Sequence, residues 1–298
     1  MSRFKYYIKW QARSIHPLIL VVISVAVIFA LHNVTFWTIW ADSFKGAEIR
    51  GIIFAVALLL LCCGLVSIFA MKRILQPFIA FLFILSSVTS YYMDQLGVII
   101  DREMIQNVVT TTLMEGKHLV TRSFLIWVGV SGIVPSILVF YFKIDHPKFF
   151  YSVIQNIAFL MLCLLGTVLL VATDIKGNSS VLRLRIDLKS SFQPLAPITE
   201  SFLYLAMITR SATLEFQEIG SDATLSSNFK KQEKPVLTVV VVGETARSQS
   251  FSLGNYSRPT NPKLENEDIV YYDNVSSCGT STAVSLPCMF SKFERSNY

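Results

Sequence analysis

Five long stretches with almost no charged residue constrain this chain more than any other feature of its sequence. The hydrocarbon core of a bilayer is about 30 Å thick and an α-helix rises about 1.5 Å per residue, so a spanning helix needs about 20 apolar residues. A buried helix of a soluble protein would carry a polar face, and these stretches carry almost none. We therefore predict a helical membrane domain with five spans, over Pro17–Trp40, Gly51–Met71, Ile74–Met93, Ser123–Phe142 and Phe149–Thr173.

The composition supports a membrane protein. Only 15% of the residues are charged and 53% are hydrophobic, whereas soluble proteins carry about 25% charged residues. The formal net charge of +6 could indicate nucleic acid as a partner. The Lys and Arg residues, however, lie at the ends of the apolar stretches and not on one basic face with interleaved aromatic residues. We expect the membrane as a partner, and no nucleic acid.

The basic residues also indicate how the chain crosses the membrane. Lys and Arg are dense in the N-terminal segment before residue 14 and in the turns at Lys72–Arg73 and Lys143–Lys148. Short loops rich in these residues stay in the cytoplasm, so we expect the N-terminus there and everything after Asp174 on the outer side of the membrane. The first span resembles a signal peptide but lacks a small-residue cleavage site, so we interpret it as an uncleaved anchor.

Three parts are expected along the chain: a membrane domain over residues 1–174, a bridging segment over residues 175–234 and the start of a soluble domain over residues 235–298. The bridging segment holds a helix candidate at Pro197–Phe216 and ends in a polar linker. The soluble part opens with Val236–Val242, in which five of the seven residues are Val. Such a density of β-branched residues predicts a buried strand, central in a parallel sheet.

Glu244 follows that predicted strand almost directly. In open α/β sheets, ligands gather at the carboxyl ends of the strands, so a carboxylate at this point is well placed to bind a metal ion. An acidic residue is also favoured at the start of a helix, where it interacts with the helix dipole. The local pattern does not decide between these two roles.

A second group of polar residues lies at Ser276–Phe290, where a hydroxyl-rich turn precedes a helix candidate. A Ser or Thr at a helix start is ordinarily an N-cap. It can also be a nucleophile, because an anionic phosphoryl group would meet free backbone N–H donors there. Cys278 and Cys288, ten residues apart, suit a disulfide in an oxidising compartment better than a metal pair.

A third candidate lies in the loop Asp94–Arg122. A helix over Met104–Gly116 would place Asn107, Thr111 and Glu115 at i, i+4 and i+8, and therefore on one face. That strip is either a solvated polar face or a surface that meets a lipid headgroup. The pattern alone favours the solvated face.

Three motifs in the soluble part resemble one family. They are Val241–Arg247 (Val-Val-Gly-Glu-Thr-Ala-Arg), Asn255–Pro262 (Asn-Tyr-Ser-Arg-Pro-Thr-Asn-Pro) and Ser277–Ser291 (Ser-Cys-Gly-Thr-Ser-Thr-Ala-Val-Ser-Leu-Pro-Cys-Met-Phe-Ser). In content and order they resemble the lipid A phosphoethanolamine transferases, which include the mobile colistin-resistance enzymes. The resemblance implies five transmembrane helices, a bridging region and a periplasmic α/β/α sulfatase-like domain, of which residues 235–298 would be the incomplete start.

The same resemblance implies chemical roles in the soluble part. Glu244 and Thr282 correspond to zinc ligands of the family. Thr282 also corresponds to the threonine that carries phosphoethanolamine as a covalent intermediate, with Thr280 as a nearby competitor. Cys278 and Cys288 correspond to a disulfide. The implied reaction transfers phosphoethanolamine from phosphatidylethanolamine to a phosphate of lipid A, through a zinc-assisted phospho-threonine, and confers polymyxin resistance. We expect the protein to be a monomer.

In the membrane domain, Asn107, Thr111 and Glu115 correspond to family residues that line the donor-lipid site. The resemblance therefore reverses the preference for a solvated face in the loop between the third and fourth spans. On this interpretation, the strip meets the headgroup of phosphatidylethanolamine near the outer leaflet.

One departure from the family pattern concerns histidine. The family's zinc site needs an Asp-His pair and further histidines late in the chain, whereas the last of the four histidines here is His146. With Glu244 and Thr282 as the only matched metal ligands, a tetrahedral zinc site cannot close. We expect the 298 residues to be the N-terminal portion of a longer enzyme, to bind zinc weakly and to lack transferase activity alone. The alternative is a non-catalytic membrane module that binds lipids or scaffolds a partner.

Overall fold

The computed structural model describes residues 14–211, 220–224, 226–227, 234–243, 246–279 and 281–293. The chain forms two compact units, Met1–Ser211 and Ala212–Tyr298. The first unit contains the predicted spans together with the bridging helices as far as Ser211, so these bridging helices pack with the spans.

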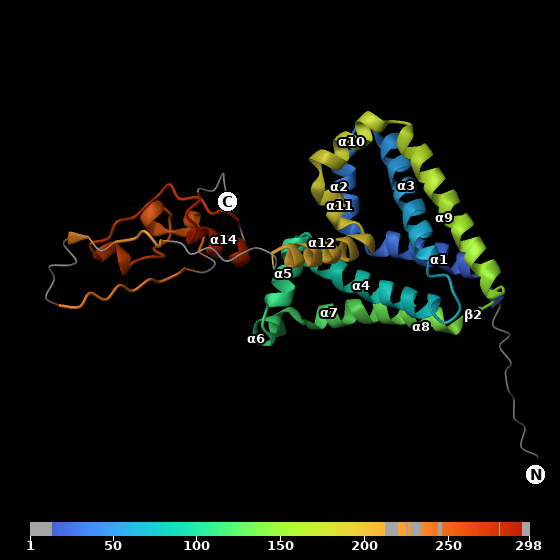
Figure 1. The fold of residues 1–298 in the computed structure, drawn as a ribbon, viewed down its shortest axis with the longest axis horizontal. Helices are drawn as coiled ribbons and strands as arrows, with labels where there is room; N and C mark the ends of the chain where they lie inside the picture. Colours follow the sequence, from blue (N-terminus) through green and yellow to red (C-terminus); the bar gives the residue numbers. More distant parts are fainter. Residues whose placement is uncertain are drawn as a thin grey trace, which may run out of the picture. The chain divides into compact units, whose positions relative to one another are not determined.

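Four of the predicted spans are confirmed as helices long and apolar enough to cross a membrane (Figure 1). Apolar side chains such as Leu162 and Leu165 point outward from the last of them, as expected of a helix that faces lipid. The fourth predicted span is a continuous run in which a π-helix joins two α-helices. The spans are α3 (Glu48–Ser67), α4 (Leu75–Leu96), α7–η2–α8 (Arg122–Trp127, Val128–Ile133 and Val134–Tyr141) and α9 (Phe149–Ala172).

The first predicted span is not one continuous helix. It consists of α1 (Pro17–Leu31) and α2 (Val34–Ser43), which are bent by 73° and make a fifth span if the pair is counted as one. The bend lies at Asn33, whose side-chain amide donates to the carbonyl of Ile28 (3.1 Å) and to that of Gln193 (3.3 Å) and accepts from the backbone N–H of Gln193 (2.7 Å). A side chain that bonds the backbone in this way competes with the helix.

Small residues let the spans approach one another. A Cβ added to Gly64 of α3 would lie 2.9 Å from the Cβ of Cys163 in α9, and one added to Gly132 would lie 3.0 Å from that of Ser87 in α4. The hydroxyls of Ser87 and Ser131 bond across the second interface at 2.8 Å. Close backbone approach and interhelical hydrogen bonds are what hold helices together in lipid, where no hydrophobic driving force acts between them.

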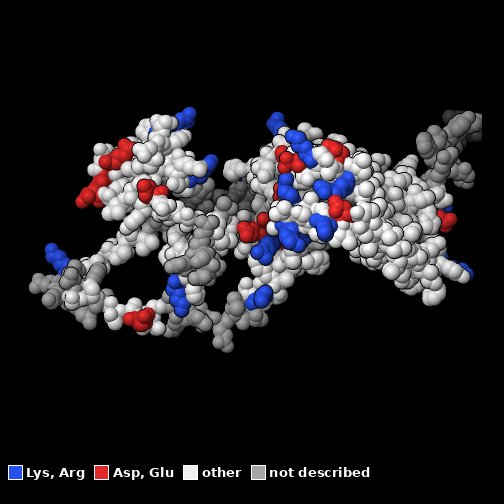
Figure 2. Space-filling view, turned by 90° about the horizontal axis from the view of Figure 1, so that it is seen from above, with Lys and Arg blue, Asp and Glu red and all other residues white. Residues whose placement is uncertain are grey.

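The bridging segment forms three helices, α10 (Ile175–Leu184), α11 (Ile186–Ser191) and α12 (Leu195–Ser211). The last confirms the predicted helix, with a start two residues earlier; residues 212–219 lie outside the described part. Arg185 pairs with Asp42 (2.7 Å) and with Asp187 (3.1 Å), and its hydrogen bonds hold the pKa of Asp187 below the usual value. Lys and Arg mingle with Asp and Glu on this side of the unit, whereas most of the remaining surface in view is uncharged (Figure 2).

Asp174 connects the last span to the bridging helices. Its carboxylate accepts from the backbone N–H of Gly177 (2.9 Å), which caps α10, and pairs with Arg50 near the start of α3 (3.2 Å). The strands β1 (Ser14–Ile15) and β2 (Lys143–Ile144) form a parallel pair that joins the chain before α1 to the α8–α9 turn.

The second unit contains short helical elements. They are the 3-10 turns η3 (Ser248–Ser250), η4 (Ser252–Gly254) and η5 (Leu264–Asn266) and the helix α14 (Thr282–Met289).

The predicted strand Val236–Val242 is wrong for this structure. These residues are irregular, and the side chains of Leu237 and Val241 are each 86% exposed. A strand needs a neighbour that takes its backbone hydrogen bonds, and the described residues of the second unit place no strand beside this segment.

Candidate functional site

The hydroxyl-rich turn does precede a helix, as predicted. The residue at the N-cap of α14 is Ser281, and Thr282 stands at the first helical position with an exposed side chain. Ser281 makes no side-chain capping bond to the first turn within the described residues, although its backbone carbonyl accepts from Val284 (3.1 Å) and Ser285 (2.9 Å). The threonine is therefore not the cap, and it stands in the first turn of the helix, whose backbone N–H groups have no partner within the helix.

A disulfide between Cys278 and Cys288 holds this turn against the helix, which confirms the predicted pairing; the two Cα atoms are 6.3 Å apart. The turn also packs closely on the first helical turn, because a Cβ added to Gly279 would lie 2.9 Å from Cγ1 of Val284. The helix start that carries Thr282 is thus held by the disulfide and by the packing of Gly279 against Val284.

A hollow of about 690 Å³ lies beside the disulfide. Two tyrosines and several serines line it, and Thr282 is not among the lining residues. The aromatic and hydroxyl groups of this wall suit a polar ligand with an apolar part. This wall could not be predicted from the sequence, because its members come from three separate segments: Ala246–Phe251, Tyr271–Cys278 and Ser285–Phe293.

Glu244 and Thr280 lie outside the described residues, so the structure does not place the predicted acidic ligand relative to Thr282. Within the described ranges, no three His, Cys, Asp or Glu side chains gather where they could hold a metal ion. Catalytic zinc sites take at least three protein ligands. The described residues therefore do not make up a zinc site.

The strip between the third and fourth spans does not form the single helix predicted over Met104–Gly116. The chain makes α5 (Arg102–Thr110) and, after a break, α6 (Leu113–Gly116) and the 3-10 turn η1 (Lys117–Leu119). Thr111 is extended (φ −67°, ψ 131°), and its hydroxyl donates to the carbonyl of Asn107 at 2.6 Å. The carbonyl of Asn107 also accepts from the backbone N–H of Thr111 (2.9 Å), so α5 keeps its last helical hydrogen bond and ends because the backbone turns extended at Thr111.

Asn107 and Thr111 nevertheless line one hollow, of about 480 Å³. The backbone of Glu115 belongs to α6, but its side chain is outside the description. Most of the wall is apolar and comes from α4, α5 and the turn after α6, including Tyr92, whose hydroxyl donates to the carbonyl of Leu119 (3.2 Å). An apolar hollow whose wall also carries polar side chains, among them Asn107 and Thr111, suits an amphiphile.

Two family models match the chain. The model described as phosphoethanolamine transferase EptA/EptB matches residues 57–207, and the sulfatase model matches residues 237–298. The chain belongs to the EptA/EptB family. The resemblance inferred from the three motifs is thereby confirmed.

Several relatives of the EptA/EptB family align with this chain. Phosphoethanolamine transferase EptA of Escherichia coli K12 is 36% identical over 224 residues, which are 75% of this chain and 41% of the relative. Phosphatidylethanolamine transferase Mcr-1 of Escherichia coli is 30% identical over 303 residues, 97% of this chain and 54% of the relative. A Kdo(2)-lipid A phosphoethanolamine 7''-transferase of Escherichia coli K12 is 26% identical over 274 residues, 85% of this chain and 47% of the relative.

The chain thus spans about half the length of the curated relatives it matches. Among solved structures, the integral membrane lipooligosaccharide phosphoethanolamine transferase EptA from Neisseria meningitidis matches with a TM-score of 0.82. The match covers 96% of this chain and 54% of that one at 22% identity, and it confirms the predicted fold class: spanning helices followed by part of a sulfatase-like domain.

Proposed function

We propose that the protein transfers phosphoethanolamine from phosphatidylethanolamine to a phosphate of lipid A. Membership of the EptA/EptB family carries this proposal, and the names of the relatives supply the donated group and the acceptor class. The position of Thr282 at an exposed helix start adds the nucleophile.

In the first step, the hydroxyl oxygen of Thr282 attacks the phosphorus of phosphatidylethanolamine. The new bond joins this oxygen to phosphorus, the bond to the glycerol oxygen breaks, and diacylglycerol leaves with the proton. The first backbone N–H groups of α14 point out of the helix start, where they would bind the phosphoryl oxygens. The disulfide keeps this helix start in place throughout.

In the second step, a phosphate oxygen of lipid A attacks the phosphorus of phospho-Thr282. The bond between phosphorus and the Thr282 oxygen breaks and the hydroxyl regains a proton, so the enzyme returns to its starting state. The product carries an added ammonium group, which offsets part of the negative charge that attracts cationic polymyxins. Resistance to polymyxin is therefore the expected consequence for the cell.

The hollow around Asn107 and Thr111 is the proposed site for the headgroup end of the donor lipid, with Glu115 as the third predicted contact. Its apolar wall would meet the adjoining part of the lipid. Holding both lipid substrates at the same membrane surface as a membrane-anchored nucleophile raises their effective concentration, which is a proximity effect.

The proposed placement follows the distribution of Lys and Arg. The N-terminus lies in the cytoplasm, the chain crosses the inner membrane five times, and the part that carries Thr282 lies in the periplasm, where a disulfide is stable. A monomer is proposed. Zinc dependence, with Glu244 and Thr282 as ligands, stays a prediction from the family resemblance.

The test uses a chimera in which residues 1–298 replace the matched part of Mcr-1. Lipid A from cells that express it is examined by mass spectrometry for added phosphoethanolamine. We expect modification by the chimera and by its Thr280→Ala variant, and none by its Thr282→Ala variant. Cells that express only the 298 residues are expected to show no modification.

Each part of the proposal has its own contrary result. Modified lipid A from the Thr282→Ala chimera would move the nucleophile elsewhere. A chimera that reaches the membrane intact but modifies no lipid A would favour the alternative of a non-catalytic lipid-binding or scaffold module. Modified lipid A from the 298 residues alone would contradict their predicted inactivity.

A further inference from the structure

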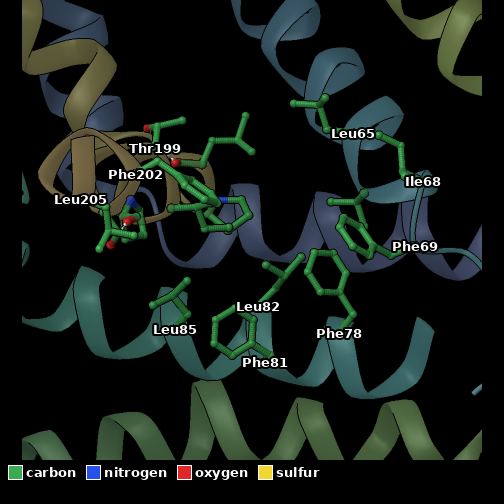
Figure 3. A pocket seen from close by; sticks show the side chains of 16 residues that line it. Leu65, Ile68, Phe69, Phe78, Phe81, Leu82, Leu85, Thr199, Phe202 and Leu205 are labelled. Carbon is green, nitrogen blue, oxygen red and sulfur yellow. Dashed lines mark hydrogen bonds between the residues drawn. The ribbon is translucent and has the colours of Figure 1, made fainter. Parts of the chain in front are cut away.

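A second hollow in the membrane unit has no part in the proposed transfer. It measures about 620 Å³ and lies between the end of α3, the first half of α4 and the bridging helix α12. In Figure 3, Phe78, Phe81 and Leu85 lie along α4. Phe69 lies beside the end of α3, and Phe202 lies on α12 across the hollow from α4. The rings of Phe69 and Phe78 stack at 4.0 Å and form one end of the hollow.

The wall of this hollow cannot hold a polar ligand. Among its sixteen lining residues, only Thr199 and Ser201 have polar side chains. Their hydroxyls already donate to carbonyls of their own helix, at 3.0 Å from Thr199 to Leu195 and at 2.6 Å from Ser201 to Pro197. A bound water needs two to four polar partners, so this space offers no place for ordered water.

The wall that α4 contributes to the hollow lies at the depth of the hydrocarbon. Leu85 is ten residues after Leu75, the first residue of α4, so the helix has risen about 15 Å at Leu85, about half the thickness of the bilayer core. At that depth the surrounding solvent is hydrocarbon. An empty volume would cost free energy that increases with its size, so this hollow is expected to be filled with hydrocarbon.

The dimensions fit an acyl chain better than a whole helix as the occupant. A helix of 10 Å diameter that rises 1.5 Å per residue takes about 120 Å³ per residue, so about five residues would fill the space. That is little more than one turn, whereas a membrane-spanning partner helix has about 20 residues. A lipid acyl chain is much thinner than a helix and fits this space along its length.

We propose that this hollow is a binding site for one acyl chain of a glycerophospholipid. The acyl chain fills the gap between α12 and the end of α3 and so supports the bridging helix from below. It enters from the lipid side, where Phe81 is 53% exposed and Phe202 67% exposed. The inference needs only the membrane location and is independent of the proposed transferase activity.

The test uses the full chain in vesicles of phosphatidylethanolamine and phosphatidylglycerol. A small share of the phosphatidylethanolamine carries a photoreactive diazirine in the middle of one acyl chain. After irradiation, labelled residues are identified by mass spectrometry. We expect labels on Phe81, Leu85 and Phe202 several-fold above those on Leu162 and Leu165, which are exposed on α9 and meet only bulk lipid.

A filling variant sharpens the result. Leu85→Trp puts a large ring into the hollow and is expected to lower the labelling of Phe81 and Phe202 several-fold, whereas the matched control Leu162→Trp leaves it unchanged. Equal labelling of the hollow and α9 in the unchanged chain would overturn the proposal, since it would show contact with bulk lipid only. Crosslinks from Phe202 to a second copy of the chain would assign the hollow to a protein partner and would overturn it as well.

Discussion

Replacing Asn33 by Ala tests whether the bend in the first span depends on the bridging segment. The amide of Asn33 bonds both backbone groups of Gln193, and both residues are 1% exposed. In the variant, the N–H of Gln193 loses its acceptor in a place that water does not reach. The carbonyl of Ile28 also loses a donor, although it still accepts from the backbone N–H of His32 at 2.9 Å.

The expected magnitude follows from these losses. Leaving one buried backbone donor unpaired costs about 1–3 kcal/mol, and a hydrogen bond between membrane helices averages about 0.6 kcal/mol with a maximum near 1.7 kcal/mol. The N–H of Gln193 is the buried donor left unpaired, and the bond from Asn33 to the carbonyl of Gln193 is the bond lost between segments. We therefore expect Asn33→Ala to lower the free energy of unfolding by about 2–3 kcal/mol, on the magnitudes of the same two principles.

The assay is reversible equilibrium unfolding of the full chain in mixed micelles. Helix content is followed by circular dichroism, and the bend is followed by the fluorescence of Trp37, whose indole N–H donates to the carbonyl of Phe29 (3.1 Å) across it. The control is Thr38→Ala, because the exposed hydroxyl of Thr38 bonds the carbonyl of Val34 in its own helix (3.0 Å).

The control variant should change the free energy of unfolding by less than about 0.5 kcal/mol, as surface substitutions usually do. If Asn33→Ala costs no more than this control, the bond between the bend and Gln193 does not hold the span in shape. The bend would then be a property of residues 32–34 alone.

Three further predictions concern the bridging helices and the disulfide. Gly177→Ala should destabilise the full chain in the same unfolding assay, because its new Cβ would collide with the carboxylate of Asp174; an unchanged midpoint would contradict this. Arg185→Gln should cost less than about 1 kcal/mol at pH 7. Because Arg185 lowers the pKa of Asp187, this stabilisation is present above about pH 4 and is lost as the pH falls further. The free energies of unfolding of the two proteins should therefore become equal in acid, and a difference that persists there would refute the pairing. Cys278→Ser opens a disulfide with a sequence separation of 10, and loop-closure entropy predicts a loss of about 2–3 kcal/mol; the second unit of the variant should be cut faster by protease than the unchanged chain under oxidising conditions.

The spans could be predicted because their cause is local. A helix that meets lipid on all sides has to be apolar along its length, so hydropathy alone found four of them. The bend at Asn33 could not be found in this way. Its partner Gln193 is 160 residues away in the sequence, and no pattern near residue 33 predicts this contact.

Two local errors had different origins. The break at Thr111 has a signal in the sequence, the run of three threonines from Thr110 to Thr112, whose β-branched side chains and hydroxyls disfavour a helix. The missing strand at Val236–Val242 shows that β-propensity expresses the fit to neighbouring strands, and the described part of the second unit provides none. The helix start at Thr282 and its disulfide were predictable because their determinants lie within fifteen residues of motif.

The bond between Asn33 and Gln193 also sets an order of events during synthesis. Asn33 leaves the ribosome 160 residues before Gln193, which at about 5–20 residues per second is roughly 8–32 s. During that time the first span has entered the membrane without the segment that completes its bend. Until four more spans have been made, the amide of Asn33 can bond the carbonyl of Ile28 in its own helix but lacks the backbone groups of Gln193.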